Sequence, residues 1–131
     1  MSLTEKDSQY LWHPYTQHKT ASAPIAITKG KGALLWDENG KEYIDAIASW
    51  WVNPYGHSNT FIAEAIYKQL TTLEHVLFGG FTHKPAVEVA EKLLAILPKN
   101  QQKLFFSDNG STAVEIAIKV ALQYFFNKGE R

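Results

Sequence analysis

The chain has 131 residues, the length of one domain, and a hydrophobic content of 45% that suits a folded protein with a core. Its 13 basic residues balance 13 acidic ones, so no surface for nucleic acid or anionic membranes is indicated, and no apolar run approaches the roughly 20 residues of a membrane span. The absence of cysteine excludes disulfides, thiolate catalysis and cysteine metal sites, and a cytoplasmic location is expected.

Residues 1–24 are interpreted as an N-terminal arm. From residue 8 to residue 24 the sequence is rich in aromatic side chains but follows neither a helical nor a strand period. We therefore expect an ordered segment that lies on another part of the protein. The alternative is that Tyr10, Trp12 and Tyr15 only pack on the body of their own domain.

Residues 25–57 predict a small antiparallel meander and an aromatic connector. The pair Asn39-Gly40 is a strong signal for a two-residue hairpin. The Lys-Gly-Lys-Gly run at residues 29–32 could suggest a phosphate loop, but no helix follows it, so a turn is predicted there. The three strands are expected at residues 25–28, 33–37 and 41–45.

The connector contains two adjacent tryptophans, Trp50 and Trp51. If this segment were a strand, successive side chains would point to opposite faces, so both rings could not enter one core. One of them is then expected to line a second surface, such as a pocket or an interface. The alternative is that both faces of the sheet are covered.

Two amphipathic helices are predicted next, over residues 59–73 and 84–97, with Pro85 in the first turn of the second helix. Between them lie Gly79 and Gly80. Paired glycines suit a close approach of the backbone to a ligand or to another chain, although an ordinary loop has the same composition.

A strand at residues 103–107 and a helix at residues 112–127 are predicted to flank the turn Asn109-Gly110-Ser111-Thr112. Unpaired N–H groups and the helix dipole make such a turn a candidate phosphate site. The alternative is a plain helix start, with Thr112 and Glu115 as a capping box and nothing bound. Dinucleotide and nucleotide-triphosphate loop motifs are absent, so the remaining candidates are a monophosphate-bearing ligand or no ligand.

The helix at residues 112–127 is apolar on nearly all sides, which predicts burial on several sides. Either a longer α/β chain, of which this sequence would be the front part, or an oligomer would supply the cover. The five histidines follow no metal-ligand spacing, so no metal site is expected.

Four segments, in this order and combination, resemble the class III aminotransferases of fold type I. The combination of two tryptophans with His-Pro-Tyr-Thr resembles more narrowly the diaminopelargonic acid synthases, the subfamily that acts in biotin biosynthesis. The segments that carry the resemblance are Trp12–Thr16, Ser49–Trp51, His75–His83 and Asp108–Glu115.

The resemblance implies an α/β fold, namely the N-terminal part of a fold type I transferase: aromatic arm, antiparallel meander, then helices and the first strand-helix unit of an incomplete large domain at residues 58–131. It implies pyridoxal phosphate as cofactor, held by Gly110 and Ser111. Tyr15, Trp50 and Trp51 would line the substrate pocket. Gly79 would approach the pocket of the partner subunit in a homodimer with shared active sites.

The implied reaction is amino transfer from S-adenosylmethionine to 8-amino-7-oxononanoate, giving 7,8-diaminononanoate. The resemblance places the Schiff-base lysine downstream of residue 131, so no catalytic residue is expected within this chain, which would be inactive in isolation. Two alternatives remain: a non-catalytic module that binds a phosphate ligand or a protein, and another class III aminotransferase of the ω-amino acid type.

Overall fold

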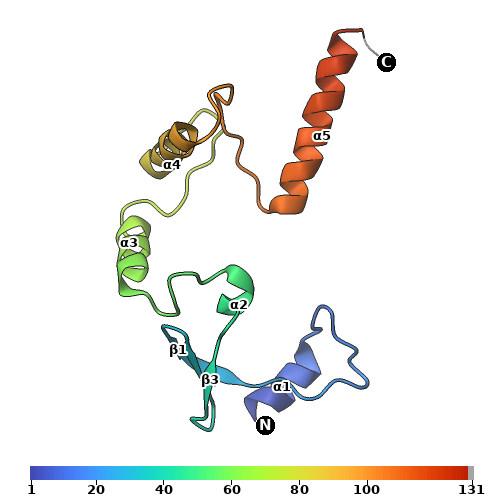
Figure 1. Cartoon of the computed structure of the whole chain (residues 1–131), viewed down its shortest axis with the longest axis vertical. Helices are drawn as coiled ribbons and strands as arrows, with labels where there is room; N and C mark the ends of the chain where they lie inside the picture. Colours follow the sequence, from blue (N-terminus) through green and yellow to red (C-terminus); the bar gives the residue numbers. More distant parts are fainter. Residues whose placement is uncertain (130–131) are drawn as a thin grey trace. The chain divides into compact units, whose positions relative to one another are not determined.

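The computed structural model describes residues 1–129. They belong to two compact units, the first from Met1 to Glu74 and the second from His75 onward. The division expected near residues 24 and 57 stays a prediction. Figure 1 traces the order of the elements. The first unit contains α1 (Leu3–Tyr10), β1 (Ile27–Lys31), β2 (Leu34–Asp37), β3 (Glu42–Ile44), α2 (Ala48–Trp51) and α3 (Thr60–Leu70), and the second contains α4 (Lys84–Ile96) and α5 (Gly110–Asn127).

The three strands form one antiparallel sheet in the order β1-β2-β3, which confirms the predicted meander. β1 continues through Lys31, with Gly30 paired to Leu35, so the turn between β1 and β2 consists of Gly32 and Ala33. The turn predicted over residues 29–32 was therefore wrong for its first three residues. Their pairing with β2 satisfies the backbone groups that a turn would leave exposed.

The β2–β3 hairpin closes on a loop of four residues, Glu38 to Lys41, instead of the predicted two. Asp37 N–H donates to the Lys41 carbonyl at 3.0 Å, and Gly40, with φ +80°, donates back to the Asp37 carbonyl at 3.0 Å. The Asp37 carboxylate accepts from the N–H groups of Asn39 and Lys41, both at 2.9 Å. An aspartate that caps its own turn in this way stabilises the longer loop.

The predicted helices at residues 59–73 and 84–97 are confirmed as α3 and α4, with α3 ending at Leu70. Asn59 caps α3 by accepting the Ile62 N–H at 3.2 Å, and Pro85 occupies the first turn of α4. α1 was not predicted. It starts on a capping box in which Ser2 and Glu5 bond each other's backbone N–H groups, a Ser-x-x-Glu signal that is visible in the sequence.

Residues 101–107 form no strand in the described chain, so the strand predicted at residues 103–107 was wrong. A strand needs a neighbour that takes up its backbone N–H and C=O groups, and the described residues pair none with this segment. The helix that follows, α5, begins at Gly110, two residues before the predicted start. Its C-terminal end agrees with the prediction, because Gly129 at φ +77° donates its N–H to the Phe126 carbonyl at 3.0 Å.

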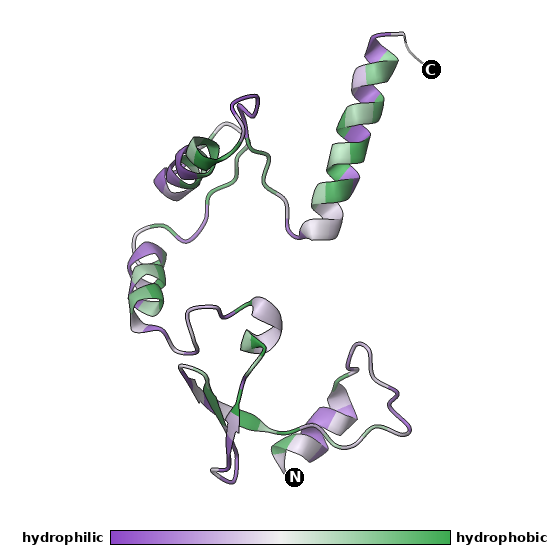
Figure 2. Ribbon diagram, viewed as in Figure 1, coloured by the Kyte–Doolittle hydropathy of each residue, from purple (hydrophilic) through white to green (hydrophobic). Residues whose placement is uncertain are grey.

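None of the described side chains is fully buried. α5 was predicted to need cover from a longer chain or from an oligomer, and among the described residues Val120, Leu122 and Phe126 are each more than 60% exposed. Figure 2 shows apolar residues along most of the length of this helix. Large apolar surfaces of this kind are typical of faces that other protein covers. Within residues 1–129, no helix is long and apolar enough to cross a membrane.

Candidate functional site

The N-cap of α5 is Asn109, which lies before the predicted helix start at Thr112. Asn109 Oδ1 accepts the Thr112 N–H at 3.0 Å, and Asn109 N–H donates to Thr112 Oγ1 at 3.2 Å. These two bonds make Asn109 and Thr112 the capping box. The predicted box between Thr112 and Glu115 was wrong, because the helix begins two residues earlier than its apolar pattern does.

This capping leaves the adjacent N–H groups of Gly110 and Ser111 without an acceptor, and the Ser111 hydroxyl also has no hydrogen bond within residues 1–129. A Cβ added at Gly110 would meet no heavy atom within 4 Å, so the turn is open at this point. Two free N–H donors and a hydroxyl at the positive end of an 18-residue helix are a donor set that fits a phosphate.

The carboxylates near this turn differ in their pairing. Glu115 lies next to Lys119, with Oε1 2.6 Å from Nζ, so its negative charge is compensated. Asp108 has no such partner in the described chain, and it opposes an anion at the turn. A hollow of about 370 Å³ adjoins the turn; it is lined by Phe106, Ser107, Asp108, Thr112, Glu115, Ile116 and Lys119, while Gly110 and Ser111 are not part of its wall.

In the first unit, the structure brings together three of the residues assigned to substrate binding. The rings of Tyr15 and Trp50 meet edge to face, with centroids 5.7 Å apart. Trp50 and Trp51 are stacked, with centroids 6.5 Å apart and an angle of 30° between the planes. All three rings are more than half exposed. They form an exposed apolar surface, here called the aromatic wall (Tyr15, Trp50 and Trp51).

The aromatic wall depends on an unusual backbone conformation in α2. Ala48, Ser49, Trp50 and Trp51 have φ values of +48°, +48°, +64° and +65°, so α2 is a left-handed turn built from residues other than glycine. The premise that the two tryptophans sit on a strand was wrong. In the left-handed turn their rings stack instead of pointing to opposite faces. Such a conformation costs roughly 1–2 kcal/mol per residue and is rare in succession.

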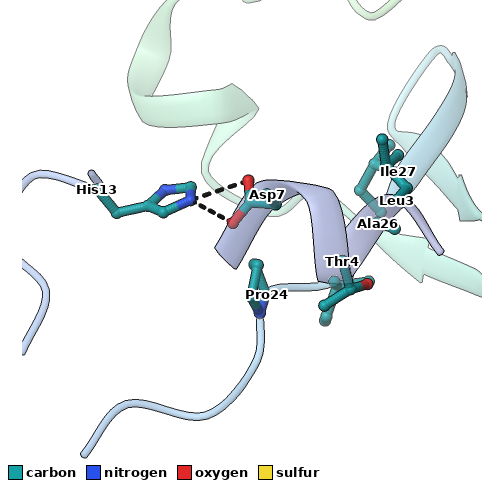
Figure 3. A pocket seen from close by; sticks show the side chains of 8 residues that line it. Leu3, Thr4, Asp7, His13, Pro24, Ala26 and Ile27 are labelled. Atoms are coloured by element: carbon teal, nitrogen blue, oxygen red, sulfur yellow. Dashed lines mark hydrogen bonds and ion pairs between the residues drawn. The ribbon is translucent and has the colours of Figure 1, made fainter. Parts of the chain in front are cut away.

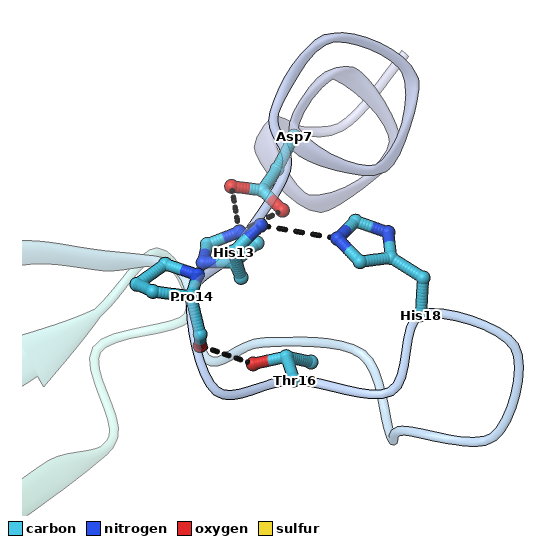
Figure 4. A network of polar contacts seen from close by, with 5 residues as sticks. All are labelled: Asp7, His13, Pro14, Thr16 and His18. Carbon is cyan, nitrogen blue, oxygen red and sulfur yellow. Dashed lines mark hydrogen bonds and ion pairs between the residues drawn. The ribbon is translucent and has the colours of Figure 1, made fainter.

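The arm that carries Tyr15 is tied down by polar contacts (Figure 4). The His13 ring bonds the Asp7 carboxylate at 2.8 Å, and the His13 N–H donates to His18 Nε2 at 3.0 Å. Between these ties, Thr16 Oγ1 donates to the Pro14 carbonyl at 2.9 Å, which closes a tight turn. These contacts hold the segment to α1, which itself lies within residues 1–24, so the prediction of a separate arm is not tested by them.

A hollow of about 240 Å³ lies between α1 and the segment that leads into β1. Figure 3 shows Leu3 beside Ala26 and Ile27 at one side of it and the Asp7–His13 pair at the other. The aromatic side chains of the arm stay outside this hollow, with Trp12 88% and Tyr15 93% exposed. Trp12 therefore does not pack on the body of the domain, whereas Tyr15 meets Trp50 edge to face.

Sequence reasoning missed a second polar cluster beside the aromatic wall. Asp45 Oδ2 accepts from the Ser49 hydroxyl and from His57 Nε2, each at 2.7 Å. The N–H and hydroxyl of Ser49, followed by the His57 ring, lower the pKa of Asp45 to about 2, so the carboxylate is ionised. Asp45 and His57 are 12 residues apart, a separation that carries no periodic signal.

Gly79 lies in the second unit, in the bend that precedes α4. A Cβ added there would come within 2.6 Å of the Leu77 side chain, a near neighbour in sequence. The adjacent Gly80 has φ +92° and open space around it. In the same unit, the Phe78 ring stacks on the His83 ring with centroids 5.2 Å apart. Gly79, Gly110 and Ser111 thus belong to one unit and the aromatic wall to the other.

Residues 15–131 match the family described as aminotransferase class III. Adenosylmethionine-8-amino-7-oxononanoate aminotransferase from Synechococcus elongatus is 53% identical over 118 residues, which are 90% of this chain and 28% of that protein. The enzyme of the same name from Staphylococcus aureus is 49% identical over 127 residues and is likewise covered to 28%. The chain spans less than a third of the length of these relatives.

Solved structures agree with this grouping. Adenosylmethionine-8-amino-7-oxononanoate aminotransferase from Methanocaldococcus jannaschii has a TM-score of 0.91 at 42% identity, with 98% of this chain and 30% of that chain covered. An omega transaminase from Pseudomonas jessenii, solved in complex with PMP, has a TM-score of 0.90 at 36% identity, with 98% and 29% covered. Both likenesses extend over nearly all of this chain and place it at the N-terminal part of the transaminase fold. The chain belongs to the class III aminotransferase family.

Proposed function

We propose that the full-length protein is a pyridoxal-phosphate-dependent aminotransferase of biotin biosynthesis. It would transfer an amino group from S-adenosylmethionine to 8-amino-7-oxononanoate and give 7,8-diaminononanoate. The observation that carries this proposal is the aromatic wall, in a chain that is 53% identical to a relative named for these two substrates. An apolar aromatic surface suits the long aliphatic chain of the keto-amine.

The start of α5 would hold the cofactor phosphate. The free N–H groups of Gly110 and Ser111 would donate to phosphate oxygens, and the Ser111 hydroxyl would add a third donor. When bound, pyridoxal phosphate supplies the electron sink that amino transfer requires. The Asn109–Thr112 capping box fixes the direction of the two N–H groups before the ligand arrives, so little ordering is needed on binding.

We assign no catalytic residue to residues 1–131. The lysine that bonds the cofactor in this family is expected downstream, and Lys103, Lys119 and Lys128 do not match its position. Lys119 is moreover engaged with Glu115 on the surface of α5. The isolated chain is therefore expected to be inactive even where it binds the cofactor.

The protein would act as a cytoplasmic homodimer with shared active sites. Gly79 would approach the pocket of the partner subunit, where a residue without a side chain permits a close backbone contact. The large exposed apolar side chains of the described residues support an assembly in which other protein covers them.

A second candidate is a class III aminotransferase of the ω-amino acid type. The likeness to the omega transaminase from Pseudomonas jessenii favours it, because its TM-score of 0.90 nearly equals that of the adenosylmethionine enzyme. The two candidates share the cofactor and differ in the amino donor and acceptor.

The test is a turnover assay of the full-length gene product with added pyridoxal phosphate. One reaction contains S-adenosylmethionine and 8-amino-7-oxononanoate, and the other contains an ω-amino acid with an oxoacid acceptor. Formation of 7,8-diaminononanoate in the first reaction is the expected result. Turnover in the second reaction alone would establish the second candidate, and pyridoxal phosphate binding without turnover in either would indicate the non-catalytic module.

Two tryptophan variants localise the substrate site in that assay. Trp50→Phe alters the aromatic wall and is expected to raise KM for 8-amino-7-oxononanoate, with a loss of roughly 0.5–1.5 kcal/mol of binding free energy. Trp36→Phe, in β2 and outside the wall, is the matched control and should leave KM unchanged. Equal KM values for the two variants would remove the wall from the substrate site.

A further inference from the structure

The left-handed turn of α2 needs support from outside itself. Its backbone hydrogen bonds include those from Trp51 N–H to the Ile47 carbonyl at 2.8 Å and from Asn53 N–H to the Ala48 carbonyl at 3.0 Å, and Val52 N–H also donates to the Ala48 carbonyl. Four successive residues other than glycine have positive φ, which is unfavourable because each Cβ crowds the neighbouring carbonyl. Contacts beyond the turn must therefore hold it in place.

Asp45 provides such a contact from the end of the sheet. It directly follows β3, and its N–H donates to the Ala33 carbonyl at 2.8 Å, so its backbone is fixed to the sheet. Its side chain is 6% exposed and reaches the Ser49 hydroxyl at 2.7 Å. Ser49 is the second residue of α2 and directly precedes Trp50. The Asp45 carboxylate, fixed to the sheet, thus holds the turn by a hydrogen bond next to Trp50.

The same carboxylate oxygen also accepts from His57 Nε2, and His57 is itself held firmly. His57 and Gly32 exchange two backbone hydrogen bonds, of 3.0 and 2.9 Å. A Cβ at Gly30 would lie 2.8 Å from the His57 Cβ, so the ring packs against bare backbone. The Ser58 hydroxyl adds a bond of 2.8 Å to the Gly30 carbonyl. The chain on both sides of α2 is therefore attached to the β1–β2 turn.

The arrangement of Asp45, Ser49 and His57 is not a nucleophilic triad. In such a triad the histidine accepts the proton of the serine hydroxyl. Here the hydroxyl and the imidazole both donate to one carboxylate oxygen, and no bond joins Ser49 to His57 within the described residues. The cluster can orient backbone and side chains, but it does not activate the serine.

We propose that Asp45 is a positioning residue which, through Ser49 and His57, holds the left-handed turn of α2 and so fixes the aromatic wall that selects the substrate. This inference rests on the proposed function only for the word substrate. The geometric part, that Asp45 sets the stacking of Trp50 on Trp51, stands independently of which reaction the full-length protein performs.

The main experiment compares Asp45→Asn with the wild type in the full-length protein. Asparagine keeps the shape but loses the charge and one acceptor. The first readout is the circular dichroism of the stacked tryptophan pair, identified as the part of the spectrum that Trp50→Phe removes. Asp45→Asn should reduce this signal by about half or more. The second readout is a KM for 8-amino-7-oxononanoate raised about tenfold, with kcat and pyridoxal phosphate affinity within about twofold.

Asp37→Asn is the matched control. Asp37 also ends a strand of the same sheet; although its own desolvation acts in the opposite direction, hydrogen bonds from Lys41 N–H and the Tyr43 hydroxyl lower its pKa. It contacts no residue of α2 within the described chain. Asp37→Asn should therefore leave the tryptophan signal and KM at wild-type values.

A double variant separates positioning from general destabilisation. Ala48→Gly places glycine at φ +48°, where it has no Cβ to clash, so the turn needs less support. Asp45→Asn combined with Ala48→Gly should regain at least half of the lost tryptophan signal. If Asp45→Asn fails to fold, Ser49→Ala removes only one of the two bonds and should show a smaller loss of the same signal.

Three results would overturn the proposal. They are an unchanged tryptophan signal in Asp45→Asn or, where that variant is unfolded, in Ser49→Ala; an equal loss in Asp37→Asn; and no recovery in the double variant. A wild-type protein that lacks the proposed turnover but shows the expected spectra would refute the proposed function and leave the positioning role intact.

Discussion

The start of α5 and the left-handed turn of α2, the two proposed ligand sites, are held in place in opposite ways. At α5 the conformation is an ordinary helix start, and Asn109 and Thr112, three residues apart, hold it with local hydrogen bonds. At α2 the conformation is unfavourable for every residue in it, and Asp45 and His57 hold it from separate parts of the first unit. The start of α5, which is held by local hydrogen bonds, should tolerate changes elsewhere in the chain. The left-handed turn of α2 should lose its conformation when the distant residues that support it change.

The largest expected effect comes from Gly56→Ala, a change outside α2 that should disturb the support of its left-handed turn. Gly56 has φ +83°, and a Cβ there would lie 2.9 Å from the Gly32 Cα, a backbone atom that cannot move aside. We expect a loss of roughly 2–5 kcal/mol from left-handed strain plus overpacking. The measurement is urea unfolding of the full-length protein.

Gly40→Ala is the matched control for this prediction. It has a similar φ of +80° but no atom within 4 Å of the added Cβ, so only the conformational cost of roughly 1–2 kcal/mol applies. The tryptophan signal of the aromatic wall should fall in Gly56→Ala and stay at the wild-type level in Gly40→Ala. Equal behaviour of the two variants would show that α2 does not depend on the Gly32–Gly56 contact.

A smaller effect is expected when the capping box at the start of α5 is changed. Asn109→Ala removes the side-chain half of the capping box and should destabilise the start of α5 by about 1 kcal/mol, within a range of 0.5–2 kcal/mol. Hydrogen exchange of the Thr112 N–H reports the change, since this group loses its acceptor. Protection of Thr112 at the wild-type level would contradict the assignment of Asn109 as the cap.

The smallest effect is expected from protonation of Asp45, which leaves the tryptophan signal unchanged at neutral pH and lowers it in acid. Its hydrogen bonds lower its pKa from an ordinary 3.8 to about 2 in the folded protein. A depressed carboxyl pKa stabilises the folded state fully above the unfolded value and loses this contribution as the pH falls toward the folded value. The tryptophan signal should therefore be constant above roughly pH 5 and decline between about pH 4 and 2.

Asp45→Asn is the control for the acid titration. It has no proton to gain at this position, so its weaker signal should show no step between about pH 4 and 2. A step of wild-type size in this variant would assign the acid transition to other carboxyl groups, such as Asp37, whose pKa is also lowered.

The features that could be predicted from the sequence are the local ones. The meander followed from short extended runs and Asn39-Gly40, and α3 and α4 followed from apolar periodicity with a capping residue and a proline. The same local reasoning could have found α1, because Ser2 and Glu5 have the spacing of a capping box. The turn at residues 109–112 was a candidate phosphate site from local pattern alone, whereas the cofactor, the roles of Gly110 and Ser111 and the substrate role of Tyr15, Trp50 and Trp51 came from resemblance to a family.

Two errors arose where a conformation depends on distant residues, whereas those in the hairpin length and in the capping box of α5 were local. The strand expected at residues 103–107 requires a neighbouring strand, which local sequence cannot supply. The left-handed turn of α2 contains no glycine, so no residue in it signals positive φ. Its support from Asp45 and His57 becomes visible only when the sheet brings the Gly32 turn next to His57.

The most direct test of the central claim measures pyridoxal phosphate affinity in Ser111→Ala and Ser107→Ala of the full-length protein. Within residues 1–129 the N–H and hydroxyl of Ser111 have no hydrogen-bond partner, whereas the Ser107 hydroxyl donates to the Asn109 carbonyl at 3.4 Å. Loss of one charge-assisted hydrogen bond should weaken binding in Ser111→Ala by roughly 1.5–3 kcal/mol, with little change in Ser107→Ala. Unchanged affinity in Ser111→Ala would contradict a phosphate site at the start of α5.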